Sequence, residues 1–334
     1  MNSPLHERFF GWHDAFNHPV TTGITIGIAA MLLLTPVVML ILSATRRVTD
    51  AHRKELFQRY YTWLALAPAM IGPVLLGAGW TIAAVLILSL LCYREFARAT
   101  GLFRERLISA LVVLGILLVF FAAMDHWYGF FMAPFPLTVG AIAAFAILSD
   151  RPKGYLQRVA LGILGFALFG CALGHLAYFA NDENYRPIVL MLLLCVELND
   201  VFAYIVGKSL GRRKLAPHTS PNKTIGGALG ALILTTALAA GLGHCIFSGT
   251  RLDGWLPLLG LGIIISVVGQ FGDLMLSSIK RDIGVKDLGV TLPGHGGLLD
   301  RFDSILLVAP ATFHYIGFFV GIGLDQPVRI ITGG

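Results

Sequence analysis

The sequence predicts an all-α fold, a polytopic membrane protein with about ten transmembrane helices. Composition is the first reason: 56% of the 334 residues are hydrophobic and only 13% are charged, with a mean hydropathy of +0.76. The second reason is that the apolar residues form runs of roughly 20, the length that crosses a hydrocarbon core about 30 Å thick. These runs are continuously apolar and do not alternate, which favours helices over a β-barrel.

Ten stretches meet the length and polarity required of a span. The first contains Pro36, and the second and third are joined at Gly77–Trp80, which predicts a tight hairpin with an interfacial tryptophan. The fifth and sixth are joined by a basic connection that contains Arg151 and Lys153. The last four flank the two most polar segments of the chain. The expected spans are 20–43, 62–78, 80–99, 105–123, 130–149, 156–180, 187–207, 224–247, 254–280 and 303–324.

Basic residues orient these spans. If alternate connections face the cytoplasm, beginning with 44–61, that side collects 21 of the 25 Lys and Arg residues. Only Arg8, Arg186, Arg251 and Arg329 remain on the other side. This asymmetry is typical of the positive-inside rule and predicts that both termini lie outside. The net charge of +6 then reflects loops near an anionic leaflet, so nucleic acid is not an expected partner.

The chain is expected to contain one membrane domain, at 60–334, preceded by an N-terminal part at 1–59. That part comprises a tail, the first span and a basic cytoplasmic loop. The first span is expected to be an anchor and not a cleaved signal, because residues 1–19 are not dominated by basic residues. The four cysteines are scattered singly through apolar segments and are interpreted as packing residues.

The most polar segment is 277–303, between the last two spans. It holds four basic residues, four aspartates and the turn His295–Gly297 within 27 residues. Cations neutralise phosphate, and carboxylates hold the divalent ion that bridges phosphate oxygens. The segment therefore favours a site for a phosphorylated ligand and a metal ion. A solvated, salt-bridged loop is the alternative. The charged residues are Lys280, Arg281, Lys286 and Arg301, with Asp282, Asp287, Asp300 and Asp303.

Helical spacing adds geometry to this segment. Asp273, Ser277 and Lys280 recur at i, i+4 and i+7, which places them on one face of the ninth span. Asp300 and Asp303 recur at i and i+3, at the start of the tenth. Two helix ends joined by a glycine-rich loop can bring carboxylates together across a cleft. Two aspartates that share a Mg²⁺ could hold a nucleoside triphosphate.

A second polar cluster occupies 197–227. Glu197, Asp200 and Tyr204 lie on one face of an otherwise apolar helix, and an ionisable residue inside a span indicates a functional site. The alternative is that Glu197 is neutral or paired with a neighbour such as His175. Further along, hydroxyls, a lysine and backbone amides meet at a helix start, which favours a phosphate cradle. The residues of this cradle are Ser220, Lys223 and Thr224.

The run from Ser277 to Asp303 resembles the signature of phosphatidate cytidylyltransferases (CDP-diacylglycerol synthases), without a mismatch across its 27 positions. The upstream stretch from Asp200 through Ser220, Lys223 and Thr224 is similar to a second conserved region of that family. The resemblance covers about 190–325, whereas 60–185 share only a hydropathy pattern and 1–59 are additional.

The resemblance implies that CTP and phosphatidic acid react to CDP-diacylglycerol and pyrophosphate, at the bacterial inner membrane and with the site facing the cytoplasm. It implies Mg²⁺ and leaves open a second, monovalent cation and a homodimer. Asp273 and Asp300 would ligate the metal. The implied catalytic residues are Ser277, Lys280, Arg281, Lys286, Asp287 and Arg301. The implied substrate-binding residues are Asp200, Tyr204, Ser220, Lys223, Thr224, His295, Gly296, Gly297 and Asp303.

One position departs from the family pattern. The family has a glutamate two residues after the Lys-Thr pair, where this chain has Gly226. We expect a slow cytidylyltransferase in which Gly226→Glu raises kcat. Three alternatives stay open: a CTP-dependent polyprenol or phytol kinase, a membrane transporter, and a non-catalytic paralogue.

Overall fold

The computed structural model describes residues 9–45, 50–292, 296–322 and 329–333, and nearly all of them lie in helices. The helices of seven residues or more are α2 (Pro19–Ala44), α3 (Asp50–Leu76), α4 (Ala78–Thr100), α5 (Arg106–Met124), α7 (Pro134–Ala146), α8 (Tyr155–Gly165), the π-helical segment η4 (Phe166–Ala172), α10 (Tyr185–Leu210), α11 (Ile225–Ile246), α12 (Trp255–Asp282) and α13 (Ile305–Val320). Shorter ones are η1 (Trp12–Asp14), η2 (Leu102–Arg104), α6 (Tyr128–Met132), η3 (Ile147–Ser149), α9 (Leu173–Tyr178), η5 (Phe179–Asn181) and η6 (Arg251–Asp253).

The predicted helical membrane fold is confirmed. Each of the ten expected spans falls on a helix or on consecutive helices. Within the described residues, eight helical segments are long and apolar enough to cross a membrane, and α13 is a shorter apolar helix. The hairpin between α3 and α4 turns at Gly77, whose φ of 141° is open only to glycine. A Cβ there would also collide with the carbonyl of Phe9.

Two of the expected elements differ in detail. We expected 44–61 to be a loop, but α3 already begins at Asp50, because 50–61 is rich in helix-forming residues such as Lys54, Glu55 and Gln58. The expected span 130–149 is divided between α6 and α7 at Pro134, which occupies the first turn of α7.

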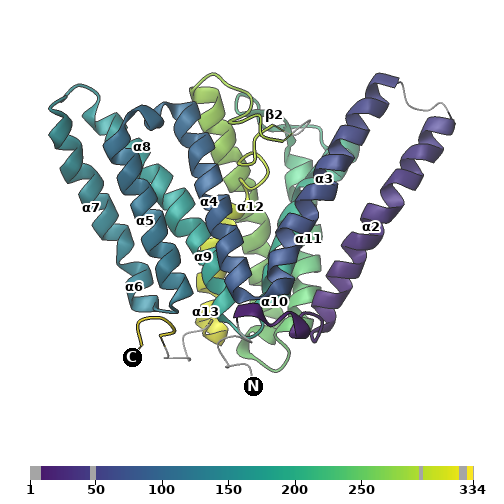
Figure 1. Ribbon diagram of the computed structural model, residues 1–334. Helices are drawn as coiled ribbons and strands as arrows, with labels where there is room; N and C mark the ends of the chain where they lie inside the picture. Colours follow the sequence, from purple (N-terminus) through teal and green to yellow (C-terminus); the bar gives the residue numbers. More distant parts are fainter. Residues whose placement is uncertain (1–8, 46–49, 293–295, 323–328, 334) are drawn as a thin grey trace.

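Figure 1 shows the helices arranged side by side, with both chain ends at one end of the bundle. The opposite end carries β2 and the loop that follows α12. Strands β1 (Lys214–Ala216) and β2 (Ser220–Thr224) pair antiparallel, with Lys214 opposite Thr224 and Ala216 opposite Ser220. This arrangement gathers the two polar segments of the sequence at the same end of the molecule.

Glycines bring the helices that carry these segments into close contact. A Cβ at Gly227 of α11 would collide with the Ala203 carbonyl of α10. A Cβ at Gly272 of α12 would lie 2.8 Å from the carbonyl oxygen of Asp303 and 3.0 Å from the Cα of Ser304. Small residues at such crossings let membrane helices approach backbone to backbone. The start of α13 is thereby held directly against α12, beside Asp273.

Candidate active site

The C-terminal part of α12 presents one polar stripe. Ser277 Oγ donates a hydrogen bond of 3.1 Å to Asp273 Oδ1, one turn earlier. Ser277 and Lys280 are both buried. Arg281 points elsewhere, since its Nε donates to the carbonyl of Thr219 in the β1–β2 turn, at 3.3 Å. The helix therefore directs three of these side chains inward and uses the fourth to fasten the hairpin.

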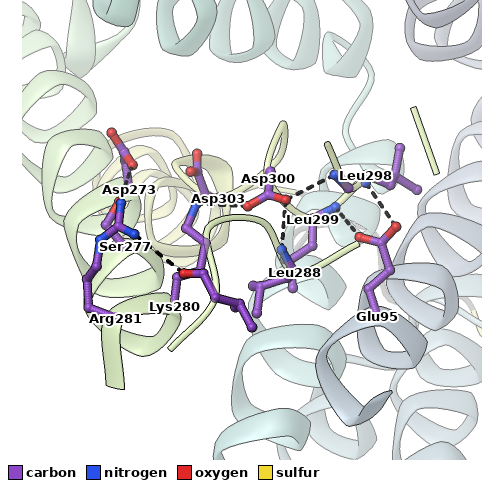
Figure 2. Close-up of polar contacts among 12 residues, drawn as sticks. Glu95, Asp273, Ser277, Lys280, Arg281, Leu288, Leu298, Leu299, Asp300 and Asp303 are labelled. Atoms are coloured by element: carbon purple, nitrogen blue, oxygen red, sulfur yellow. Dashed lines mark hydrogen bonds and ion pairs between the residues drawn. The ribbon is translucent and has the colours of Figure 1, made fainter. Parts of the chain in front are cut away.

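Lys280 and Asp300 form a buried ion pair. The distance from Lys280 Nζ to Asp300 Oδ1 is 2.8 Å, and the two side chains are 11% and 2% exposed. The other carboxylate oxygen of Asp300 accepts hydrogen bonds from the amides of Leu288, at 3.1 Å, and Gly297, at 3.0 Å (Figure 2). Both oxygens of Asp300 are thus engaged. This aspartate shapes the loop between α12 and α13.

A second ion pair joins the two polar segments. Lys223, on β2, contacts the carboxylate of Asp273 on α12. Both side chains are about four-fifths buried, with exposures of 19% and 18%. Because the two residues are 50 positions apart, the sequence could place them near one another only through the family resemblance.

Further charges surround this pair. Asp200 interacts electrostatically with Lys223, Asp273 and Arg301. Asp303 directly precedes α13, is buried, and interacts electrostatically with Asp273 and Asp200. Arg301 keeps its Nε buried, without a hydrogen-bond partner among the described residues. Carboxylates and cations therefore alternate in one cluster.

Glu95 of α4 was missed by the sequence analysis. Its carboxylate accepts hydrogen bonds from the amides of Leu298, at 3.0 Å, and Leu299, at 2.9 Å (Figure 2). It also accepts one from the hydroxyl of Thr291. It is 8% exposed. A charged residue at the end of an apolar span was a usable signal, but its basic neighbours Arg94 and Arg98 made the segment resemble an ordinary cytoplasmic boundary.

The glycines of the loop make room for these carboxylates. A Cβ at Gly289 would lie 2.5 Å from Glu95 Oε1, and one at Gly297 would lie 2.6 Å from Oε2. Gly296 has φ 82°, and a Cβ there would lie 3.1 Å from the carboxyl carbon of Asp287. The loop is consequently clamped between Glu95 on one side and Asp300 on the other.

Other predicted residues lie at the margin of the cluster. Thr224 caps α11, where its Oγ1 accepts from the amide of Gly227 at 3.1 Å, so that amide is not free for phosphate. Tyr204 is 67% exposed and lies under Lys208, with 5.9 Å between the ammonium nitrogen and the ring centroid. Ser220 is half-buried, and Lys286 and Asp287 are exposed. His295 lies outside the described residues.

The carboxylates can be tested for their fit to Mg²⁺, which prefers oxygen ligands. Among the described residues, no three His, Cys, Asp or Glu side chains converge as a ready metal site. Asp300 is already saturated by Lys280 and two amides. Asp303 uses Oδ1 for the amide and hydroxyl of Ser304, and no hydrogen bond to its Oδ2 is found in the described part of the chain. Asp273 also engages both oxygens, with Ser277 and Lys223, but its side chain is 18% exposed whereas that of Asp300 is 2% exposed. Asp273 and the second oxygen of Asp303 are therefore more available to a metal ion than Asp300, whose metal role stays a prediction.

Comparison with known proteins places this cluster in context. The sequence profile of the cytidylyltransferase family matches residues 57–319, most of the chain. The chain belongs to the cytidylyltransferase family. The profile includes every helix that contributes to the cluster, whereas α2 precedes it.

Individual members of the family show the same relationship. The chain is 33% identical over 279 residues to the uncharacterized protein YnbB of Escherichia coli, covering 81% of this chain and 91% of that protein. It is 36% identical over 228 residues to a phosphatidate cytidylyltransferase of Bacillus subtilis, covering 64% and 81%. It is 40% identical over 169 residues to a phosphatidate cytidylyltransferase of Staphylococcus haemolyticus, covering 51% of this chain and 63% of that enzyme.

Proposed function

We propose that this cytidylyltransferase-family protein transfers the cytidylyl group of CTP to phosphatidic acid at the cytoplasmic face of the bacterial inner membrane. The observation that carries the proposal is the cluster formed by Lys223–Asp273, Lys280–Asp300 and Arg301. Cations and carboxylates from β2, from α12 and from the loop between α12 and α13 (the glycine loop) meet at one end of the membrane bundle. Reaction between two anionic substrates needs this combination, because the positive charges offset their repulsion.

The chemistry requires no protein nucleophile. An oxygen of the lipid phosphate attacks the α-phosphorus of CTP, and a new P–O bond forms there. The bond from the α-phosphorus to the oxygen bridging it to the β-phosphorus breaks, and pyrophosphate leaves with that electron pair. A phosphomonoester is already anionic at neutral pH, so no base is needed to remove a proton.

The residues of the cluster have separate roles in this proposal. Lys223 and Arg301 hold phosphate oxygens, and Lys280 fixes Asp300 and with it the loop. Mg²⁺, bound through Asp273 with Asp303, would supply further positive charge to the phosphates. A monovalent cation and a homodimer, both left open by the resemblance, stay predictions.

The experiment uses purified protein in detergent with phosphatidic acid, Mg²⁺ and CTP labelled either at the α- or at the γ-phosphorus. We expect the α-label to enter the lipid and the γ-label to appear in pyrophosphate, with both lost when EDTA is added. A parallel reaction contains a polyprenol or phytol in place of phosphatidic acid, and transfer of the γ-label to that alcohol would instead identify a lipid kinase. Absence of any transfer, with a Bacillus subtilis phosphatidate cytidylyltransferase active in parallel, would refute the proposal.

A further inference from the structure

A large cavity lies beside the charged cluster, within the membrane-spanning part of the molecule. Its volume is about 960 Å³, and its walls come from α2, α3, α10 and α11. Figure 1 shows α2 and α3 on one flank of the bundle. The lining is almost entirely aliphatic and aromatic, with Arg59, Tyr60 and Glu197 as its main polar side chains. Neither the charged cluster nor the proposed reaction assigns it a role.

The shape of the cavity indicates the kind of occupant. Along α2 its lining runs from Pro19 to Met39. Twenty helical residues rise about 30 Å, close to the thickness of the hydrocarbon core. An apolar space of this length, inside a bilayer, suits extended hydrocarbon chains and excludes a water-soluble ligand.

The cavity also borders the charged cluster along α10. Glu197, Leu198 and Val201 line the cavity, and Asp200 between them belongs to the cluster, where it interacts electrostatically with Arg301. Val201 of α10 continues the wall toward the hairpin end. A lipid whose chains lie in the cavity would therefore bring its headgroup to the side of α10 that faces Arg301.

We propose that this cavity binds the acyl chains of the acceptor lipid, and that α2 sets the chain length the protein accepts. The proposal rests on the proposed lipid cytidylyltransferase function. Helix α2 precedes the residues that the family profile matches, so the outer wall of the cavity lies outside the matched segment. A wall outside that segment can alter specificity without altering the chemistry.

Two glycines of α2 allow a direct test. Gly23 and Gly27 line the cavity, and a Cβ at either would meet no atom within 4 Å. Gly23 lies near the end of the cavity that is remote from the charged cluster. Gly23→Phe would therefore fill the remote end, where only a long chain reaches. Gly140 of α7 has equally open surroundings but does not line the cavity, so Gly140→Phe is the matched control.

The first experiment compares dipalmitoyl and dioctanoyl phosphatidic acid as acceptors. We expect Gly23→Phe to raise KM for the dipalmitoyl lipid by about tenfold, because a few methylene groups at the end of each chain would lose their apolar contacts. KM for the dioctanoyl lipid and for CTP should stay unchanged, as should both lipid values for Gly140→Phe. An unchanged dipalmitoyl KM for Gly23→Phe, or an equal rise in Gly140→Phe, would overturn the proposal.

The second experiment does not depend on turnover. Phosphatidic acid with a photoreactive diazirine at the methyl end of one chain is irradiated with the intact protein in phosphatidylcholine vesicles. We expect cross-links on α2 and α10, reduced in Gly23→Phe and in Gly27→Phe. Cross-links confined to α5 and α7, or to α2 of a second copy, would overturn the cavity as a lipid site. Cross-linking to the cavity without any cytidylyl transfer would support the site and refute the proposed reaction.

Discussion

Asp273 and Asp300 look equivalent in the sequence but have different surroundings in the structure. Asp273, whose side chain is 18% exposed, is accessible enough to exchange its partner Lys223 for a metal ion. Asp300 is enclosed, with Lys280 and two loop amides on its oxygens. Replacing each by asparagine should therefore give different results.

We expect Asp273→Asn to lose nearly all turnover while its melting temperature in detergent changes little. Asp300→Asn should lose turnover and melt earlier, because it leaves the buried Lys280 unpaired, at a cost of about 3–5 kcal/mol. Activity and thermal melting of the two purified variants check this. More than about a tenth of the activity remaining in Asp273→Asn, a barrier change of only ~1.4 kcal/mol, would contradict its role in the site.

Glu95 offers a second prediction at the scale of single residues. Glu95→Gln keeps the size of the side chain but weakens the hydrogen bonds to Leu298 and Leu299, since bonds to a charged acceptor are the stronger kind. We expect kcat to fall about tenfold or more through misplacement of the loop. Ser89→Ala is the control, because Ser89 also lies buried on α4 and bonds the Phe169 carbonyl at 2.6 Å, away from the loop.

Both variants should have similar melting temperatures, while only Glu95→Gln should lose kcat. Equal losses of activity in the two variants would mean that Glu95 serves only the packing of α4.

The sequence predicted individual site residues only where a charged or polar side chain stands out in an apolar segment. Charge on an apolar background located Asp273, Lys280 and Asp300, and helical spacing placed Ser277 correctly beside Asp273. It could not distinguish a carboxylate that holds a loop from one that is available to a ligand. That difference depends on which backbone amides converge on each oxygen, and the loop that supplies them is irregular.

At the scale of elements, the crossing of α10 and α11 changes the interpretation of Gly226. A Cβ at Gly226 would lie 3.2 Å from both the Cα of Gly211 and the carbonyl oxygen of Leu210. These neighbours are backbone atoms at the end of α10, which move aside less easily than the end of a flexible side chain. We therefore expect Gly226→Glu to lower kcat, whereas the sequence alone led us to expect a higher kcat. Gly226 is part of the helix contact that positions Lys223 on the adjoining strand.

We expect Gly226→Ala to lower the melting temperature, with an overpacking cost of about 1–3 kcal/mol, and Gly226→Glu to lower both stability and kcat. Gly241→Ala, on the same helix with no atom within 4 Å of its Cβ, should leave stability unchanged or raise it. Thermal melting and initial rates of the three variants are the measurements. A Gly226→Glu variant with wild-type stability and higher kcat would restore the original expectation.

Helices themselves were the most predictable elements, because a span must be apolar throughout and must satisfy its own backbone hydrogen bonds. Their ends were less predictable. The start of α3 at Asp50 depends on helix propensity in a charged segment, which hydropathy does not measure. The short hairpin of β1 and β2 depends on tertiary contacts such as Arg281 with Thr219.

At the scale of the whole molecule, topology decides whether CTP can reach the site. Figure 1 places the start of α2 and the end of α13 opposite β2 and the loop between α12 and α13. The end of the molecule that carries β2 contains most of the Lys and Arg residues. Both observations are consistent with one orientation, in which the charged cluster faces the cytoplasm.

Single cysteines in a background without the four native ones provide that measurement. Lys153→Cys and His218→Cys lie at the end with the charged cluster, and Glu183→Cys and Ser248→Cys lie at the opposite end; all four positions are exposed. In intact cells, a membrane-impermeant maleimide should label only Glu183→Cys and Ser248→Cys. The other two should react only after the membrane is opened. Because CTP is cytoplasmic and carries several negative charges, a site on the outer face could not be supplied with it. Labelling of His218→Cys from outside would therefore mean that CTP cannot reach the charged cluster, and it would refute the proposed reaction.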